Sequence, residues 1–355
     1  MALWRGVDGV RVLLTGHQGY LGTVMAPVLA AAGHDVVGLD SGLFADCVLG
    51  PMPEDPPGIV ADLRDVTLDQ LAGFDAVVHL AALSNDPLGS LAPQITYDIN
   101  QHASTRLAGL ARDAGVSRFL YASTCSVYGA AGSNGLVAED APLRPVTPYA
   151  ESKVRVEDEL FALADDGFCP VSLRNATAFG FSPRLRADIV LNNLVGHAVL
   201  TGVVRVLSDG TPWRPLVHAA DIAGAFLAAL EAPCPVVDER AFNVGSEANN
   251  VTVAQIADAV VATVPGSTLA ITGENGSDPR SYRVDFSAVR AALPTFRPQW
   301  TIEAGARELY RAYTAHGLTQ DTFDRRFTRL TRLSDRQAAG ELSADMHPIR
   351  AAVAP

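Results

Sequence analysis

The sequence predicts an α/β fold organised around a doubly wound parallel sheet. Short apolar runs rich in β-branched residues alternate with Ala- and Leu-rich helical stretches from about residue 10 to residue 178. The first apolar run is followed at once by glycine, as at the turn from a buried strand into a helix. A chain of 355 residues with 48% hydrophobic residues is also long enough to bury a large core without disulfide or metal supports.

The first elements form a predicted βαβ unit. Residues 10–15 have the pattern of a buried strand, and residues 25–32 that of a helix ending at Gly33. Glycine is common directly after a helix because it adopts the left-handed conformation without strain. Residues 34–39 are a second predicted strand, ending at Asp40. The unit spans about thirty residues, the size that this motif needs.

The alternation continues toward the middle of the chain. Further strands are expected at 76–80, 119–122 and 170–173, and further helices at 95–114 and 149–163. Proline and glycine mark residues 51–58 and 130–148 as loops. Beyond residue 179 the alternation weakens; the pattern there predicts helices at 192–201, 221–230, 253–264 and 302–316, and strands at 203–207 and 242–245.

A glycine-rich turn follows the first strand. Gly16, Gly19 and Gly22 form a G-x-x-G-x-x-G pattern, with Tyr20 and Leu21 between the last two. The first glycine permits a tight turn, the second lets backbone N–H groups approach a diphosphate, and the third allows the helix to pack closely on the sheet. The N-terminus of the following helix adds partial positive charge. We therefore expect a dinucleotide to bind at this turn.

Asp40 indicates which dinucleotide is bound. It lies eighteen residues after Gly22, where a carboxylate accepts hydrogen bonds from both ribose hydroxyls of NAD and repels the 2′-phosphate of NADP. No arginine follows nearby, so the predicted cofactor is NAD. Asp62 and Leu63 follow a short apolar run, and the Asp62 carboxylate is equally consistent with an acceptor for the adenine amino group and with a helix N-cap.

Tyr149 and Lys153 are the first candidates for catalysis. Their spacing places both on one face of a predicted helix. A phenol with a pKa near 10 is a weak base at neutral pH, but a neighbouring ammonium group and a bound nicotinamide ring both stabilise the phenolate. Tyr149 is then able to remove a proton from a substrate hydroxyl and to return it. A surface Tyr–Lys pair is the alternative interpretation.

Small hydroxyl residues at 123–126 follow a predicted strand. In open α/β sheets this end of a strand is where ligands bind. Thr124 is therefore expected to hydrogen-bond the reacting oxygen, both as part of the catalytic group and as a substrate contact. The alternative is that these hydroxyls satisfy backbone groups after the strand.

Composition narrows the range of partners. The formal net charge of −12 argues against nucleic acid, although a few local arginines suffice to bind an anionic small substrate. The four cysteines, Cys47, Cys125, Cys169 and Cys234, are scattered without a C-x-x-C pair. We therefore expect no metal site, no disulfide framework and a cytoplasmic location. No stretch approaches ~18 uncharged apolar residues, so no membrane association is expected.

The segment 321–355 is a separate Arg-rich C-terminal tail. Between Asp324 and Arg350 the pattern is consistent with a solvated helix or a packing arm, and also with a binding role.

Taken together, these residues resemble the extended short-chain dehydrogenase/reductase family, in particular its NAD-dependent sugar-nucleotide epimerases and dehydratases. The resemblance covers roughly residues 10 to 315. Its markers include, besides the residues above, His79, Leu80, Ala81 and Ala82 at a strand end, Asn100, Pro148 to Lys153, Leu173-Arg174, Gly180, Val217-His218 with Asp221, and Phe242 to Gly245.

The resemblance implies two domains. The NAD-binding domain, of Rossmann type, would comprise residues 1–178 plus about 213–246. A smaller α/β substrate domain would comprise about 179–212 plus 247–320. It also implies that Thr124, Tyr149 and Lys153 form the catalytic group, that Leu80, Ala81 and Ala82 line the cofactor pocket, and that a homodimer forms through helices 95–114 and 149–163.

The resemblance also suggests residues for the sugar nucleotide. Arg205, Arg214 and Arg280 are candidates for the diphosphate, and Asn192 or Asn193 would add a hydrogen bond. The remaining candidates for substrate binding are Ser84, Asn85, Thr124, Asn175 and Thr177.

The sequence departs from the family at two places that matter for the reaction. The 4,6-dehydratases of the family usually carry Thr-Asp-Glu where this chain has Thr124, Cys125 and Ser126. Without the acid and base that expel water, a standard 4,6-dehydratase is disfavoured. Cys125 is either an additional acid or base beside the nicotinamide, and hence a catalytic candidate, or a small buried apolar residue.

The leading hypothesis is an NAD-dependent sugar-nucleotide epimerase that works through a transient keto-sugar, with Tyr149 as acid and base. A keto-sugar reductase using NAD(P) or an atypical dehydratase is the alternative. A third hypothesis, a catalytically silent protein that senses the cofactor, is opposed by the intact Tyr149, Lys153 and Thr124.

Overall fold

The computed structural model describes residues 9–84, 92–129, 135–274 and 281–349. Its centre is a seven-stranded parallel sheet with the strand order β11-β7-β5-β4-β1-β2-β3. The strands are β1 (Arg11–Thr15), β2 (Asp35–Asp40), β3 (Gly58–Val60), β4 (Ala76–His79), β5 (Arg118–Thr124), β7 (Cys169–Asn175) and β11 (Arg240–Val244). The predicted doubly wound α/β fold is confirmed.

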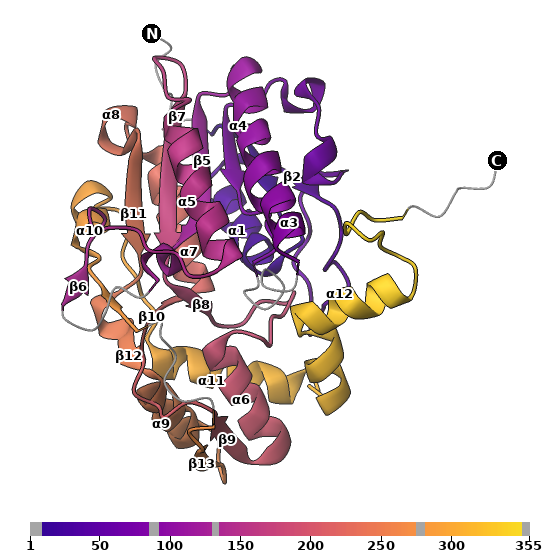
Figure 1. The fold of residues 1–355 in the computed structure, drawn as a ribbon, viewed down its shortest axis with the longest axis vertical. Helices are drawn as coiled ribbons and strands as arrows, with labels where there is room; N and C mark the ends of the chain where they lie inside the picture. The colour runs from indigo at the N-terminus through magenta and orange to yellow at the C-terminus, as the bar shows by residue number, and fades with distance from the viewer. Residues whose placement is uncertain (1–8, 85–91, 130–134, 275–280, 350–355) are drawn as a thin grey trace.

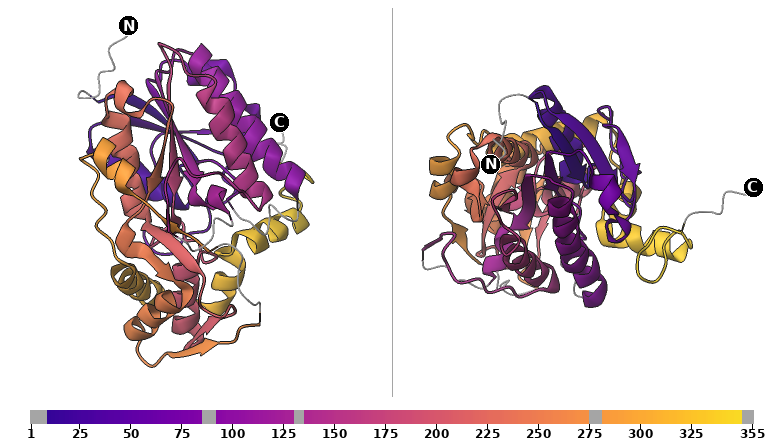
Figure 2. Two further views of the ribbon diagram at one scale, coloured as in Figure 1. Left: turned by 60° about the vertical axis from the view of Figure 1, so that its left-hand side comes forward. Right: turned by 90° about the horizontal axis from the view of Figure 1, so that it is seen from above.

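Helices cover both faces of this sheet (Figures 1 and 2). One face carries α4 (Ala103–Asp113) and α5 (Pro148–Phe161), and the other carries α1 (Tyr20–Ala31) and α7 (Ala219–Glu231). The central strands are buried on both sides because each helical layer presents its apolar face to the sheet. The resulting cores are dominated by Val, Leu, Ala and Phe.

The helix predicted at 95–114 is not a continuous α-helix. It consists of α3 (Pro93–Thr96), a π-helical turn at Tyr97–His102, and α4. Asn100, in the π-helical turn, accepts a hydrogen bond from the N–H of Leu83 at 2.8 Å and donates to its carbonyl at 3.0 Å. The local departure from α-helical geometry thus clamps the loop that follows β4.

A second part of the molecule lies at the carboxyl ends of the strands. It has its own apolar core, built from α6, α9, α11 and neighbouring strands. Its elements are β8 (Thr177–Phe179), α6 (Val190–Thr201), β9 (Val203–Val206), β10 (Trp213–His218), β12 (Asn250–Thr252), α9 (Val253–Thr263), β13 (Thr268–Ile271) and α11 (Ile302–Ala315). Strand β10 pairs with β8 and β12, whereas α7 and β11 return to the central sheet.

Short elements complete the description. They are β6 (Leu136–Val137), which pairs with β14 (Arg283–Val284), and the helices α8 (Cys234–Val237), α10 (Ser287–Ala292) and α12 (Arg329–Ala338). Helix α12 belongs to the Arg-rich tail, and it packs beside the loops after β2 and β4 (Figure 1). The described part of the tail is therefore packed against the rest of the molecule and is not a solvated helix, and such packing is compatible with a binding role.

Candidate active site

A cavity of about 560 Å³ lies at the carboxyl ends of β1, β2, β4 and β5. The parallel strands all end at this edge of the sheet, and so the loops after them contribute to one site. The predicted residues that line it are Gly16, Gly19, Tyr20, Leu21, Gly22, Asp40, Asp62, Leu63, Leu80, Ala81, Ala82, Ser84, Thr124, Tyr149, Lys153, Asn175, Thr177 and Arg214.

The glycine turn connects β1 to α1 in a conformation that larger residues do not fit. Gly16 has φ +76°, and its N–H donates to the carbonyl of Leu39 at 2.8 Å. A Cβ on Gly22 would lie 2.2 Å from the carbonyl oxygen of Gly16. Helix α1 begins directly after Gly19, with its N-terminus at the cavity. This geometry brings the positive end of the helix dipole to the cavity, where it favours a bound phosphate.

Asp40 ends β2 at the rim of the same cavity. One carboxylate oxygen accepts from the N–H of Gln18 at 3.0 Å, and the other accepts from the N–H of Gly42 at 2.8 Å. These two bonds fix the plane of the carboxylate. Because each carboxylate oxygen is able to accept more than one hydrogen bond, Asp40 can still accept hydrogen bonds from ribose hydroxyls.

Asp62 has a structural role that accounts for its position. It caps a short 3₁₀ turn by accepting from the N–H of Arg64 at 2.9 Å. Its carboxylate also forms an ion pair with the Arg64 guanidinium at 2.8 Å. The cap and the ion pair engage both oxygens, although Asp62 still lines the cavity.

Tyr149 and Lys153 occupy the other end of the cavity, on the first turns of α5. The Lys153 side chain is 3% exposed, and its Nζ donates to the carbonyl of Ala122 at 2.8 Å. The same nitrogen lies 4.6 Å from the centre of the Tyr121 ring and 5.7 Å from that of Tyr149. Burial lowers the pKa of Lys153 to about 7, partly opposed by the Glu157 carboxylate one turn along the helix.

Thr124 ends β5 on the same side of the cavity. Its hydroxyl oxygen accepts from the N–H of Ser126 at 3.1 Å, and its hydroxyl donates to the Ser126 side chain at 3.2 Å. Ser123 and Ser126 also line the cavity. The loop after β5 therefore presents hydroxyl groups beside Tyr149.

A buried ionic network supports α5 from beneath. Arg174 on β7 donates to both oxygens of Glu157, with the shortest contact at 2.6 Å. The same guanidinium donates to the Tyr128 hydroxyl at 3.0 Å, and that hydroxyl donates to Asn243 at 2.7 Å. Because Glu157 is on the helix that carries Lys153, this network fixes the helix relative to β5 and β7.

Cys125 is not placed for catalysis, which corrects its inclusion among the catalytic candidates. Its side chain is 1% exposed within the apolar core and does not line the cavity. Its Sγ lies 3.1 Å from the carbonyl oxygen of Arg174, and burial strongly raises the pKa of the thiol. The sequence could not decide this because adjacent residues in the 3₁₀ turn at Cys125–Tyr128 point in different directions.

Three of the substrate candidates lie elsewhere. Asn192 is fully buried and holds the loop after β8, donating to the carbonyls of Gly180 and Arg186. Asn193 donates to the carbonyl of Ala187 in the same loop. Arg205 is exposed on β9 and forms an ion pair with Glu274. The predictions for Asn85 and Arg280 lie outside the described residues.

The structure adds cavity residues that sequence reasoning missed. They include Arg186, Asp188 and Ile189 from the loop between β8 and α6, Val190 at the start of α6, Leu43 and Phe44 after β2, and Arg329 and Leu333 from the tail. The Arg184-Leu185-Arg186 sequence and the arginines of the tail were the available signals. Neither feature has a fixed spacing to the glycine turn, and so neither marked a site.

One group of potential metal ligands occurs among the described residues. Sγ of Cys169, Sγ of Cys234 and a carboxylate oxygen of Asp238 lie within 4.8 Å of one another. They are near the amino end of β7, at the opposite edge of the sheet from the cavity. The charge of Arg118 acts on both thiols and disfavours a cation there.

Within the described ranges, no helix combines the length and the apolar character needed to cross a bilayer.

The cavity lining fits NAD in two respects. Side chains at Gly16 and Gly22 would fill the turn that receives a diphosphate. The second respect concerns Asn175, which lines the end of the cavity near Tyr149. Its Nδ2 donates to the carbonyl of Ser123 at 3.2 Å, whereas its buried Oδ1 has no hydrogen-bond partner among the described residues. An acceptor left in this state favours a ligand with a donor, such as a carboxamide.

A family model matches residues 12–245, and its description is the NAD dependent epimerase/dehydratase family. The matched region contains the glycine turn, Asp40, Thr124, Tyr149 and Lys153.

Among curated proteins, the chain is similar to UDP-glucose 4-epimerases. It is 31% identical over 252 residues to that of Corynebacterium glutamicum, covering 67% of this chain and 75% of the relative. It is 31% identical over 248 residues to that of Mycolicibacterium smegmatis, covering 67% and 77%.

Solved structures show the same fold. The structure described as MoeE5 in complex with UDP-glucuronic acid and NAD has a TM-score of 0.71 at 28% identity, covering 86% of this chain and 99% of the other. The NAD-dependent NDP-hexosamine 5,6-dehydratase TunA has a TM-score of 0.77 at 24% identity, covering 87% and 99%.

Proposed function

The chain belongs to the NAD-dependent epimerase/dehydratase family, and on this premise we propose that it is a sugar-nucleotide epimerase that inverts C4 of a UDP-hexose. Its cofactor is NAD. The observation that carries the proposal is the position of Tyr149, Lys153 and Thr124 at one end of a cavity whose other end is the glycine turn and Asp40. The names of the curated relatives suggest the UDP-hexose and the carbon.

Tyr149 is the proposed acid and base. It removes the proton of the C4 hydroxyl while the hydride leaves C4, and it returns the proton after the keto-sugar has turned its other face. Bound NAD supplies the reversible hydride acceptor. The Lys153 ammonium stabilises the phenolate, and its bond to the carbonyl of Ala122 fixes its position. Thr124 donates a hydrogen bond to the reacting oxygen.

The same end of the cavity supports epimerisation over elimination. Loss of water from a keto-sugar requires an acid and a base next to the ring, in addition to Tyr149. Here Ser126 lines the cavity after Thr124, and the Cys125 thiol is turned into the core. The β5 loop supplies hydroxyls and no carboxylate at that point.

The substrate side of the site is also a proposal. Arg214 on β10 lines the cavity, and its guanidinium donates to the carbonyl of Trp213 at 2.9 Å. We assign it to the substrate diphosphate, with Asn175 and Thr177 nearer the sugar. Ser84, whose hydroxyl accepts from Arg186 at 3.0 Å, stays a further substrate candidate. We also propose the division into an NAD-binding domain (residues 1–178 and about 213–246) and a substrate domain, although apolar residues between 282 and 296 pack in the core of the sheet and Cys47 and Leu49 pack in the second core.

The direct test is conversion from both directions. Purified protein is incubated with UDP-glucose and, separately, with UDP-galactose, and the products are followed by NMR. We expect both reactions to reach the same mixture without added reductant or accumulation of NADH. In D2O the inverted carbon carries no deuterium, because the hydride returns from the cofactor.

Other outcomes identify the alternatives. A product lighter by one water would establish a dehydratase, and steady consumption of NADPH would establish a reductase. A parallel set of dTDP-, GDP- and CDP-sugars checks the base, and conversion of one of these instead of the UDP-sugars would overturn the UDP assignment while keeping the reaction class.

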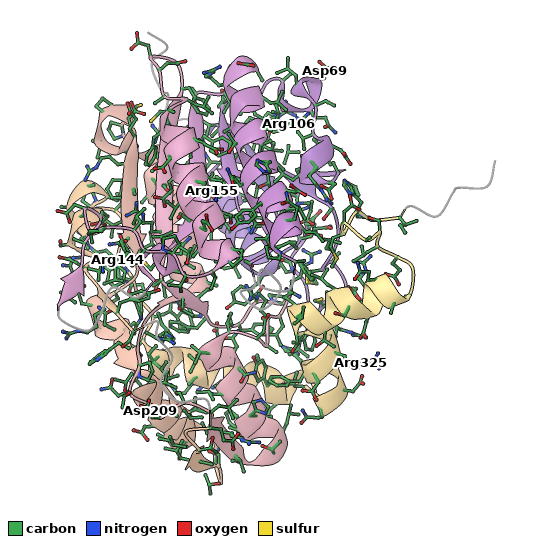
Figure 3. The ribbon with its side chains drawn as sticks, in the orientation of Figure 1. Asp69, Arg106, Arg144, Arg155, Asp209 and Arg325 are labelled. Carbon is green, nitrogen blue, oxygen red and sulfur yellow. The ribbon has the colours of Figure 1, made fainter. Side chains whose placement is uncertain are left out.

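We further propose a homodimer formed through α4 and α5, which lie side by side on the outer face of the sheet (Figure 1). Figure 3 shows Arg155 on α5 and Arg106 on α4 on this outer side. Within the chain, the π-helical turn that precedes α4 is joined to α5, because Tyr97 donates to Glu151 and Gln101 donates to Glu159. Sedimentation at micromolar concentration tests the state, and a monomer would exclude it.

The proposed location is the cytoplasm, and the proposed partner is a small sugar nucleotide and not a nucleic acid. Cys47, Cys125, Cys169 and Cys234 are free thiols, as expected in a reducing compartment. The net charge of −12 opposes binding to polynucleotides.

A further inference from the structure

The C-terminal arm, residues 319–349, runs from the second part of the molecule to the mouth of the cavity. It comprises a π-helical turn at Thr322–Arg326, helix α12 and the segment after it. In Figures 1 and 2 α12 extends beside the loops at the carboxyl ends of the central strands. Two of its residues, Arg329 and Leu333, line the cavity.

Polar contacts fix the arm to the loops that surround the cofactor end. Arg336 donates to the carbonyls of Gly42 and Leu43, the latter at 2.8 Å. Arg332 forms an ion pair with Asp46 at 2.5 Å. Past α12, the carbonyl of Asp345 accepts from Arg64 at 2.7 Å. The arm is therefore anchored on both sides of the loop after Asp40.

Apolar contacts close the same region. Leu333 is 1% exposed and packs in a small cluster with Leu43, Leu83 and Ile99. Leu43 follows β2, and Leu83 follows β4, so this cluster lies between the two loops that flank the predicted adenosine ribose. Burial of these apolar side chains stabilises the docked arm.

Arg329 is the unusual residue of the arm. It is 4% exposed, yet its Nη1 and Nη2 have no hydrogen-bond partner among the described residues. Its guanidinium stacks over the Phe44 ring at 4.3 Å, and the Cys47 thiol beside it is only a weak acceptor. A buried arginine without an anion is costly, and so this position favours a bound anion.

The charged groups next to Arg329 leave a local excess of positive charge. The neighbouring charged groups are Arg186 and Asp188, and these two are paired with each other at 3.0 Å. Two guanidinium groups thus face one carboxylate. Both arginines line the same cavity as the glycine turn, and their charges act on the phenol of Tyr20, whose hydroxyl donates to the carbonyl of Gly180.

We propose that the C-terminal arm is a clasp for NAD, in which Arg329, together with Arg186, binds the cofactor diphosphate opposite the N-terminus of α1. NAD is favoured over the substrate diphosphate because the arm packs on the loop after Asp40, at the cofactor end. The clasp slows release of NAD, as required when one cofactor molecule serves successive turnovers. This inference rests on NAD as the cofactor and not on the identity of the sugar.

The test compares two arginines of the same arm. Arg329→Leu removes the buried guanidinium, and Arg325→Ala removes an exposed one that pairs with Asp335. NAD affinity and release rate are measured by calorimetry and by stopped-flow exchange with a fluorescent NAD analogue, without sugar nucleotide. We expect Arg329→Leu to weaken NAD binding about 10- to 100-fold, mainly through faster release, and Arg325→Ala to leave it unchanged.

Further measurements separate the clasp from a structural role. UDP affinity is expected to stay within about twofold in Arg329→Leu. The NAD-free variant is expected to be at least as stable to urea as the NAD-free wild type, because an unpaired buried charge has been removed. Unchanged NAD affinity, a loss confined to UDP, or equal losses in both variants would each overturn the proposal. Failure of epimerase activity alone would leave these binding results in place.

Discussion

The two sides of the cavity are built in different ways. On the sheet side, the glycine turn, Asp40 and Thr124 lie at or next to the ends of strands, and Lys153 lies within α5. On the opposite side, Arg186 comes from an irregular loop and Arg329 from the C-terminal arm. Strand ends are fixed by the ladder of the sheet, whereas loop and arm residues depend on contacts made far along the chain. We therefore expect the sheet side to determine the chemical step and the opposite side to determine retention of ligands.

Tyr149→Phe is the variant with the largest expected effect, and it tests whether the sheet side controls the chemical step alone. Removal of the phenol eliminates the acid and base, and we expect turnover to fall about 10³-fold. NAD affinity should stay within a few fold, since the hydroxyl is not part of the diphosphate site. Product formation by NMR and NAD calorimetry on the same sample check both statements. A variant that loses NAD together with activity would show that the two sides are not separable.

The next effect concerns the network beneath α5. Glu157→Gln leaves the Arg174 guanidinium buried without its anion, and we expect a loss of about 3 kcal/mol in the free energy of unfolding. Glu151→Gln is the matched control on the same helix, since its pair with Arg155 is exposed and contributes about 0.5 kcal/mol. Urea unfolding measures both. Equal losses in the two variants would contradict the assigned role of the buried pair.

Lys153→Met tests the electrostatic part of the sheet side. Loss of the cation leaves the Tyr149 phenol unassisted, and we expect kcat at pH 7 to fall about 10²-fold. The deficit should shrink as the pH rises toward the usual phenol pKa near 10. In the wild type, the assistance from Lys153 decreases as the pH rises. Burial lowers the pKa of Lys153 to about 7, so the stabilising ammonium is progressively lost above that pH in the enzyme without cofactor. A deficit independent of pH would indicate a purely structural lysine.

The smallest effect is expected for Cys125→Ala. The thiol is buried in the core and does not line the cavity, so kcat should remain within about twofold. The smaller side chain leaves a small void, which costs about 1 kcal/mol of stability. Cys169→Ala, another buried thiol at the far edge of the sheet, provides the comparison. A tenfold loss of kcat confined to Cys125→Ala would restore the catalytic hypothesis for this residue.

The same comparison explains what could be predicted from the sequence. The strands around Gly16, Asp40 and Thr124 have strong local patterns, and parallel strand ends converge on one edge, so their proximity follows from the fold class. Tyr149 and Lys153 are one helical turn apart, which fixes their common face. The sheet side of the site was therefore accessible by local reasoning.

The opposite side required information that local patterns do not contain. Arg205 and Arg186 are both arginines beyond residue 179, yet one is exposed on β9 and the other lines the cavity. The sequence also does not show that the Asn192 side chain donates to the carbonyl of Gly180 and so is not available to a ligand. The π-helical turn around Asn100 was also missed, since its sequence has ordinary helical periodicity.

The position of the C-terminal arm has a consequence for the order of folding. The ion pair between Arg332 and Asp46 joins residues 286 positions apart. Closing a flexible loop of that length from an unfolded chain costs about 5 kcal/mol of entropy, and the arm repays it only after the intervening chain is already compact. We therefore expect the arm to dock late, onto a finished sheet. Late docking would leave the cofactor cavity complete but still open for a time, and NAD would enter most readily before the proposed clasp is in place.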